Sequence, residues 1–263
     1  MMDDQPRDGG SAETALNERQ ARIVERVDQQ GFVTIDALAR DFAVSAQTVR
    51  REIIRLDELG VLQRFHGGAG RSGSGNRLSY ADKQHREADL KARIGVAMAA
   101  ALSPGQSVFL DVGTTAEATA QALCAIERLT IVTPSAANAR ILAANPALEV
   151  ILTGGRIVGP DLSMAGAVAL RTVASYRFDW AIIACSGIDA IGAVLDFDAE
   201  KIAIKQRAME MANRKALIAD STKFSRSALI EIAGIGAFDL VVTDTRPPRE
   251  IVDRLSTDGL LLA

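Results

Sequence analysis

Residues 44–68, VSAQTVRREIIRLDELGVLQRFHGG, constrain the fold of this chain more than any other stretch. Val49, Ile53 and Leu56 recur at i, i+4 and i+7, which places them on one apolar face of a helix that points toward a small core. Gln47 and Arg51 lie on the opposite face, flanked by Thr48 and Arg50, so that this face is short, polar and cationic. A major groove is wide enough to admit such a helix. The stretch therefore predicts a DNA-recognition helix that runs into a β-wing.

The residues on either side predict the rest of a small domain. A first helix is expected from Asn17 to Gln30, and Thr34 can cap a second helix over residues 35–42. Ser45 caps the third helix, which ends at Gly60. A strand over residues 61–65 is then turned back by two glycines. Three helices and a hairpin make a winged helix-turn-helix.

The charge balance shows that the basic character is local. The chain has 263 residues, a net charge of −3 and 48% hydrophobic residues, enough for a substantial core. Residues 17–71 contain nine Arg and eight Asp or Glu, so this segment is nearly neutral. The basic side chains gather at Arg50, Arg51, Arg55, Arg64 and His66. Affinity for DNA should therefore depend on where charge is placed, and should fall steeply with salt.

Other classes of protein fit the sequence poorly. The acidic, polar segment 1–15 is expected to be a disordered tail and excludes a signal peptide. The longest apolar run, Val96 to Leu102, is too short to span a bilayer, so a cytoplasmic protein is expected. Cys124 and Cys185 lie far apart in apolar segments, as expected of buried reduced thiols. The sequence offers no metal-ligand spacing and points to no cofactor.

From Ile94 onward the pattern changes to alternating strands and helices, which predicts a mostly parallel sheet covered on both faces. The expected strands are Ser107–Leu110, Thr130–Thr133, Val150–Leu152, Trp180–Ala184, Ala216–Ala219 and Leu240–Thr243. The fold class is therefore α/β, with an N-terminal winged helix-turn-helix. The expected divisions are a tail at 1–15, the DNA-binding domain at 16–70, a linker at 71–93 and an effector-sensing domain at 94–263.

The loops that follow the strands are rich in Gly, Ser and Thr. In a parallel sheet, ligands bind at the carboxyl ends of the strands, where these loops lie. Asp111-Val112-Gly113-Thr114-Thr115 leads into a helix whose free N–H groups suit an anion, although an ordinary capped turn would read the same way. Thr133-Pro134-Ser135, Thr153-Gly154-Gly155 and Ser186-Gly187-Ile188-Asp189 follow the next three strands. Together these loops predict a site for a small phosphorylated, hydroxyl-rich molecule.

Charged residues follow the last of these loops. Glu200 and Lys205 are about 140° apart around a helix, so they do not share one stripe. A functional interpretation has Lys205 meeting a phosphate while acidic groups hold hydroxyls. A solvated helix face is the alternative. The segment 220–224, DSTKF, could add a further cation or form a capped turn.

These motifs resemble those of the DeoR-type bacterial repressors, in order through residues 17–263. SAQTVRREIIRL and LQRFHGG are similar to the DNA-binding signature of that family. DVGTT, the Gly-Gly after the third strand, SGID and the Glu-x4-Lys stretch are similar to its sugar-phosphate sensor domain. The resemblance implies a winged-helix domain joined to a domain similar to ribose-5-phosphate isomerase.

The resemblance also implies the site residues. The DNA-binding set is Ser45, Gln47, Thr48, Arg50, Arg51, Arg64 and His66. The effector-binding set is Asp111, Gly113, Thr114, Thr115, Gly154, Gly155, Gly187, Asp189, Glu200 and Lys205. Two positions depart from the family pattern: Pro134-Ser135 replaces an Asn-rich turn, and Phe65 replaces a more polar wing residue.

The implied function is repression of a carbon-catabolic operon, relieved when a phosphorylated metabolite binds. LDVGTTAEATAQAL, SGIDAIGAVLDFDAEKIAIK and VVTDTRPP are most similar to the branch of the family that governs glycerol 3-phosphate metabolism, so that metabolite is expected before other sugar phosphates. Operators with twofold symmetry imply a homodimer or homotetramer.

Two other functions remain open from the sequence. A sugar-phosphate isomerase would need a base and a cation near the reacting carbons, but the lysine- and glycine-rich turn of such enzymes is missing at Ala193-Val194-Leu195. Catalysis therefore looks lost while binding is kept. An interaction module without a small ligand is the second alternative.

Overall fold

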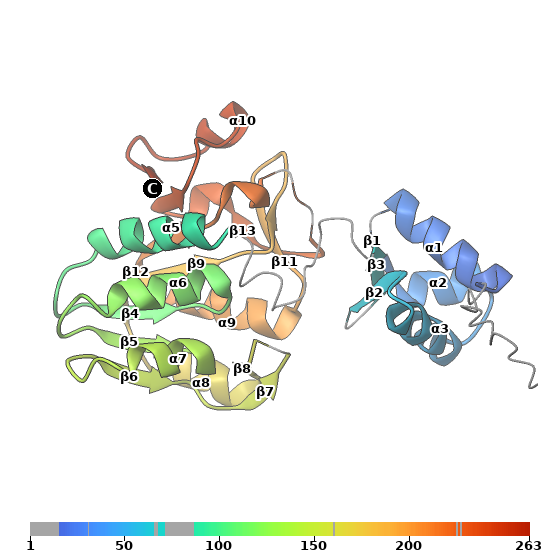
Figure 1. Cartoon of the computed structure of the whole chain (residues 1–263), viewed down its shortest axis with the longest axis horizontal. Helices are drawn as coiled ribbons and strands as arrows, with labels where there is room; N and C mark the ends of the chain where they lie inside the picture. Colours follow the sequence, from blue (N-terminus) through green and yellow to red (C-terminus); the bar gives the residue numbers. More distant parts are fainter. Residues whose placement is uncertain are drawn as a thin grey trace, which may run out of the picture. The chain divides into compact units, whose positions relative to one another are not determined.

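The computed structural model describes residues 16–30, 32–65, 68–71, 87–159, 161–224, 226 and 228–263. It consists of two compact units, Met1–Ser74 and Gly75–Ala263 (Figure 1). The tail expected at 1–15 and the central part of the expected linker lie outside the described residues. The end of that linker, residues 88–93, is instead the start of helix α5, because Lys91 and Ile94 are buried against the second unit.

The first unit is the winged helix-turn-helix that the sequence predicts. Its elements are α1 (Glu18–Gln30), β1 (Phe32–Thr34), α2 (Ile35–Asp41), α3 (Ala46–Glu58), β2 (Leu62–Phe65) and β3 (Gly68–Arg71). The hairpin β2–β3 is antiparallel, and β1 adds to it in the order β1-β3-β2. The Thr34 and Ser45 side chains accept hydrogen bonds from Ala37 N and Thr48 N, so both expected caps are confirmed.

The core of this unit follows the predicted helical period. Val49, Ile53 and Leu56 of α3 are fully buried and pack in one cluster with Ile23 of α1 and Leu38 of α2. Since these side chains fill one face of α3, the opposite face is left to solvent.

A parallel sheet of seven strands forms the centre of the second unit. The strand order is β15-β14-β12-β9-β4-β5-β6, and every pair is parallel. The bounds are β4 (Ser107–Leu110), β5 (Thr130–Thr133), β6 (Glu149–Leu152), β9 (Phe178–Ala184), β12 (Ala212–Ile218), β14 (Leu240–Thr243) and β15 (Leu260–Leu262). All six predicted strands are present, and β15 is an additional edge strand.

Helices cover both faces of this sheet (Figure 1). The helices α5 (Ala88–Ala100), α6 (Thr114–Leu123) and α7 (Ala136–Leu142) share one apolar cluster with Val108 and Leu110. The helices α8 (Ala167–Ala174) and α9 (Ala199–Glu210) share the other with Phe109. Successive residues of β4 therefore point to opposite faces, as a doubly covered strand requires. No described helix is long and apolar enough to cross a membrane.

Several short elements are not evident from the sequence. β7 (Arg156–Val158) and β8 (Ser163–Ala165) form a hairpin between β6 and α8. β10 (Gly187–Ile188), β11 (Ala193–Asp196) and β13 (Ile230–Gly234) form a small antiparallel sheet. The remaining elements are α10 (Arg249–Val252) and the 3₁₀ turns η1 (Ser221–Lys223) and η2 (Ile235–Ala237). Strands of two to five residues are too short to show a period in the sequence.

The winding of the sheet reverses between β4 and β9. From β4 the chain proceeds through β5 to β6 on one side, whereas from β9 it proceeds through β12, β14 and β15 on the other. In open parallel sheets, the carboxyl ends of the strands at such a reversal open a crevice that binds ligands. Asp111 and Cys185, directly after these two strands, mark that place.

Helices α5 and α6 pack closely at Gly95, and this contact can be tested by substitution. An added Cβ would lie 2.7 Å from the Ala118 carbonyl oxygen, so Gly95→Ala should lower the free energy of unfolding by about 1–3 kcal/mol. Alanine favours a helix over glycine elsewhere, so a loss here would be due to the clash. Trp180, the single tryptophan, lies buried in β9 and reports unfolding of this unit by fluorescence in urea.

Gly234→Ala is the matched control, because its Cβ would meet nothing within 4 Å and its φ is −68°. Equal stability of the two variants would contradict the close packing of α5 on α6.

Candidate functional sites

The exposed face of α3 carries the predicted DNA-binding side chains. Gln47, Arg50 and Arg51 are exposed on the side opposite the buried stripe. The Ser45 and Thr48 hydroxyl groups lie 2.9 Å apart, and Ser45 Oγ accepts the Thr48 N–H. Ser45 and Thr48 therefore fix the start of α3, while Gln47, Arg50 and Arg51 point exposed polar groups toward solvent.

A carboxylate of α3 bonds to the wing, in addition to the core packing of Leu62 and Ala69 against α3. Asp57 Oδ1 accepts a hydrogen bond of 2.9 Å from the Arg64 backbone N–H. The Arg64 side chain itself is exposed on β2. His66, the other predicted wing residue, lies outside the described residues.

Helix α1 holds α3 through Glu52. Arg19 forms an ion pair with Glu52 Oε1, and Gln20 Nε2 donates to Glu52 Oε2 at 2.7 Å. Burial opposes ionisation of this carboxyl, but the bonds from Arg19 and Gln20 outweigh it and lower the pKa of Glu52. Glu52, which follows Arg51, therefore holds α3 against α1 and is not available for contact with DNA.

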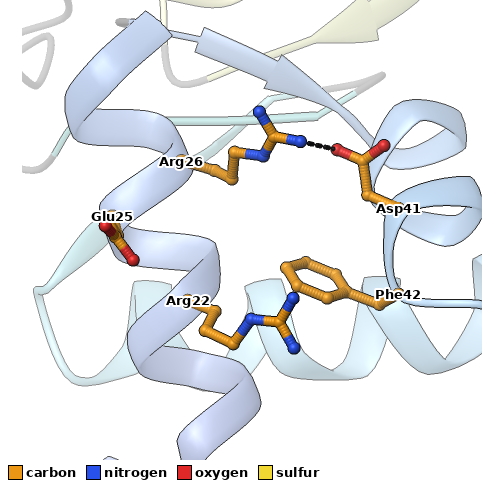
Figure 2. Close-up of a pocket in the computed structure, with 5 residues that line it drawn as sticks. All are labelled: Arg22, Glu25, Arg26, Asp41 and Phe42. Atoms are coloured by element: carbon orange, nitrogen blue, oxygen red, sulfur yellow. Dashed lines mark hydrogen bonds and ion pairs between the residues drawn. The ribbon is translucent and has the colours of Figure 1, made fainter.

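A surface hollow of about 310 Å³ lies between α1 and the end of α2 (Figure 2). The Arg22 guanidinium lies 4.9 Å from the centre of the Phe42 ring, and Arg26 forms a 2.7 Å ion pair with Asp41. Glu25 completes the lining. None of the predicted effector residues lines this hollow, and its contacts serve to join α1 to α2.

In the second unit, a buried lysine lies among carboxylates at the reversal between β4 and β9. Lys205 Nζ on α9 is 2.5 Å from Asp111 Oδ2, 3.0 Å from Asp196 Oδ2 and 2.8 Å from the Ala184 carbonyl oxygen. Lys205 and Asp111 are each about 1% exposed. Sequence reasoning paired these two residues in one site, and the structure brings them into contact.

The three contacts use all three N–H donors of the ammonium group. A direct bond from Lys205 to a phosphate would therefore require one of them to break. The Ala184 N–H also donates to Asp111 Oδ2, at 2.9 Å. The Asp111–Lys205 pair thus joins β4, β9, β11 and α9 at one point.

Two of the three charges of this cluster are stabilised. Burial opposes ionisation of Asp196, but Lys205 and the Ser186 hydroxyl lower its pKa to about 2. Burial also disfavours the ammonium, but Asp111 and Asp196 raise the pKa of Lys205. At Asp111, burial outweighs the attraction of Lys205 and raises the pKa of the carboxyl group. Asp196 and Lys205 therefore stay ionised throughout the neutral range.

The start of α6 has the geometry expected of an anion site. Gly113 precedes the helix with φ +115°, and an added Cβ would meet nothing within 4 Å. No side chain of the described residues caps this end, and the first backbone bond into the helix runs from Glu117 N to Gly113 O. Thr114 is partly exposed and Thr115 is buried. The open approach and the unpaired N–H groups of the first turn can accept a phosphate.

The other three predicted glycines are explained by the chain itself. A Cβ at Gly155 would lie 2.7 Å from the Ala165 carbonyl oxygen, and one at Gly187 would clash with the Arg226 carbonyl oxygen. At these two positions, segments of the chain pass close to each other. Gly154 is instead required by its backbone, which has φ +70°.

The remaining two predicted residues are engaged outside the lysine cluster. Asp189 Oδ1 accepts the N–H groups of Ile191 and Ala193 within the β10–β11 turn, at 3.0 and 2.8 Å. Glu200 is exposed and pairs with Arg156 of β7 at 2.6 Å. Among the described residues, neither Asp189 nor Glu200 forms a hydrogen bond or an ion pair with Asp111 or Lys205.

Both cysteines are free thiols and are only partly buried, so the expectation of full burial was wrong. Burial nevertheless raises the pKa of the Cys185 thiol to about 12, which keeps it protonated at neutral pH. The described residues contain no cluster of His, Cys, Asp or Glu that could hold a metal ion.

Both units match models of one protein family. Residues 19–74 match the DeoR-like helix-turn-helix domain, and residues 86–245 match the DeoR C terminal sensor domain. The chain belongs to the DeoR family.

Several characterised DeoR-family proteins are similar along nearly their whole length. The chain is 34% identical to the glycerol-3-phosphate regulon repressor of Escherichia coli (strain K12), over 93% of this chain and 97% of that protein. It is 34% identical to the HTH-type transcriptional repressor CsqR of the same organism, over 91% and 92%. The glycerol-3-phosphate regulon repressor of Haemophilus influenzae is 31% identical over 87% and 89%.

Solved structures are more distant. The full-length sorbitol operon regulator SorC from Klebsiella pneumoniae has a TM-score of 0.41 at 14% identity, over 87% of this chain and 97% of that one. Ribose 5-phosphate isomerase A from Methanocaldococcus jannaschii has a TM-score of 0.38 at 13% identity, over 52% and 54%.

Several residues that the predicted site sets omit have notable positions in the structure. Asp196 is the second carboxylate on Lys205, and Asn138 Nδ2 donates to the Asp111 carbonyl oxygen at 2.7 Å. Gly166 starts α8 as Gly113 starts α6, with φ +90° and open space at its Cβ. Asn138 Oδ1 and Ser163 Oγ are buried without a hydrogen-bond partner among the described residues. Of these residues, Asp196 and Asn138 contact Lys205 and Asp111.

Removing the buried ammonium should destabilise the second unit strongly. In Lys205→Met, Asp111 and Asp196 would face each other without a cation, and the free energy of unfolding should fall by about 3–5 kcal/mol at pH 7. Arg207→Met on the same helix removes only an exposed pair with Glu210 and should cost less than about 1 kcal/mol. Urea unfolding followed by Trp180 fluorescence compares the two.

The effect should depend on pH in a defined direction. Because the pKa of Asp196 is lowered to about 2, the stability it contributes is fully present above its unfolded value, near 4, and is lost as the pH falls toward 2. The difference between parent and Lys205→Met should therefore shrink below about pH 4. A difference that stays constant down to pH 2.5 would show that the cluster does not carry this charge.

Proposed function

We propose that this chain is a transcriptional repressor of a carbon-catabolic operon that leaves its operator when a phosphorylated metabolite binds. The whole-length similarity to glycerol-3-phosphate regulon repressors supports glycerol 3-phosphate as that metabolite. The uncapped start of α6, beside the buried Asp111–Lys205 pair, is the observation that carries the proposal. A protein that binds operator DNA in this way works in the cytoplasm.

DNA binding is assigned to the exposed face of α3 and to the wing. Gln47, Arg50 and Arg51 enter the major groove, while Arg64 of the wing, with His66, meets the backbone. Ser45 and Thr48 stand at the helix start, where hydroxyl and N–H groups suit a phosphate. One DNA-binding unit contacts only one half-site of a twofold symmetric operator, so the protein binds DNA as a homodimer or homotetramer.

Effector binding is assigned to the carboxyl ends of the strands. The phosphate lies on the N–H groups and hydroxyls of Gly113, Thr114 and Thr115, with the partial positive charge of α6 behind it. Lys205 acts through Asp111, which it holds in place. Gly154, Gly155, Gly187, Asp189 and Glu200 shape the walls of the site through their packing and turns.

The response follows from a shift between two populations of the protein. The effector must bind the released state more tightly than the DNA-bound state, since equal affinity for both would change nothing. An isomerase activity is not favoured. The buried lysine is already neutralised by two carboxylates, and the relatives are named as repressors.

Glycerol 3-phosphate should release the protein from a duplex that it binds, as measured in a gel-shift titration. In Thr114→Val, the hydroxyl is lost but the backbone N–H remains, and the effector concentration for half release should rise at least tenfold. Thr257→Val, at an exposed position, is the control and should behave as the parent. A response to another sugar phosphate alone would replace glycerol 3-phosphate as effector, whereas no response to any would remove the sensor site.

Arg51→Ala should weaken operator binding by about 1–3 kcal/mol without loss of fold, and it should reduce the dependence of affinity on salt. Arg249→Ala removes the same charge from exposed α10 and should leave affinity unchanged. Fluorescence anisotropy with a labelled duplex at several salt concentrations measures both. Parent-like affinity of the Arg51 variant would exclude this face of α3 as the DNA contact.

A further inference from the structure

One apolar side chain stands on the exposed polar face of α3. Ile54 is 38% exposed, whereas its neighbour Ile53 is fully buried. The buried stripe of the helix, Val49, Ile53 and Leu56, already supplies its share of the core, and Ile54 is not part of the cluster that those residues form. Packing within the unit therefore does not explain an isoleucine at this position.

The position of Ile54 relative to the polar groups is fixed by the helix period. Gln47, Arg50, Arg51 and Ile54 follow the spacing i, i+3, i+4, i+7, which places all four on one stripe. Homeodomain recognition helices reach base edges with the same spacing. A helical side chain leans toward the N-terminus of its helix, so Ile54 covers the surface beside Arg50 and Arg51.

Ile54 is the apolar residue of this otherwise polar stripe. Arg55 pairs with Glu58 at 3.6 Å, on the flank of Ile54. When α3 enters a groove, Arg50 and Arg51 can reach phosphates or guanine, and Gln47 can bond to adenine. An isoleucine cannot bond to any of these groups, and it would bury polar base edges at a cost. The one apolar group that base pairs present in the major groove is the C5-methyl of thymine.

We infer that Ile54 reads a thymine by packing against its C5-methyl group, and that this contact helps to set which operator the protein recognises. The inference rests on the proposed insertion of the α3 stripe into the major groove. It adds a specificity-determining residue that lies outside the polar set Gln47, Thr48, Arg50 and Arg51.

The contact can be tested on the DNA by removing a single methyl group. A duplex is first selected from a randomised library by the full-length chain. Each thymine in it is then replaced in turn by deoxyuracil, which lacks only the methyl, and affinity is measured by fluorescence anisotropy. At one thymine per half-site the parent protein should lose about fourfold in affinity, as expected for one buried methyl group. Ile54→Ala should bind the thymine duplex more weakly and show no further loss at that deoxyuracil.

Ile157→Ala is the matched control, because this isoleucine is 57% exposed on β7 of the other unit. It should retain both the parent affinity and the loss at deoxyuracil. Circular dichroism checks the fold of each variant; because Ile54 is outside the core, its truncation should leave the helical signal unchanged.

The outcomes separate this inference from the proposed function. If Arg51→Ala loses affinity but no thymine responds to deoxyuracil, or if Ile54→Ala responds as the parent does, the reading of thymine by Ile54 is overturned and the α3 interface stands. If Arg51→Ala binds as the parent does, the insertion of α3 fails, and the role of Ile54 fails with it.

Discussion

The buried contact of Lys205 with Asp111 and Asp196 organises the sensor unit. It lies where the sheet reverses its winding, and it joins the end of β4 to α9 and to the small sheet that contains β11. A buried ion pair contributes little net stability compared with apolar packing of the same volume, but removal of one partner is costly. Its value here is therefore positional, because it fixes the loop that leads to Gly113 and the start of α6.

This arrangement divides the work of the site between two kinds of group. The charged side chains of Lys205, Asp111 and Asp196 pair with one another. Backbone N–H groups and hydroxyls at the start of α6 remain available to a ligand. The Gly113 loop is open to an anion, whereas Gly155 and Gly187 are needed because the chain passes close to itself. Glycines of similar appearance in the sequence thus have different physical reasons.

Much of the fold follows from local patterns. The Val49, Ile53 and Leu56 stripe, the caps Thr34 and Ser45, and the β-branched runs gave the winged helix-turn-helix and six of the seven strands of the main sheet. Asp111 and Lys205 were both expected in one effector site, but Lys205 was expected to meet a phosphate, whereas in the structure it contacts Asp111. The sequence placed the acidic segment that contains Asp196 at the same edge as Lys205, but it did not single out Asp196 as a partner of the lysine. The role of Asn138 was not predicted, because its contact with Asp111 depends on the turn after β5. The contacts of Asp189 and Glu200 could not be predicted either. The sequence does not show that Asp189 bonds within its own turn, or that Glu200 pairs with Arg156.

The two stripes of α3 have no residue in common, and the helix is held from outside both of them by Glu52 and Asp57. Side chains on the outward stripe can therefore be exchanged without repacking the interior. A lineage of such proteins could acquire new target promoters through a few surface replacements while its folding remained as before. The DNA sequence that the protein recognises can thus change without loss of its stability.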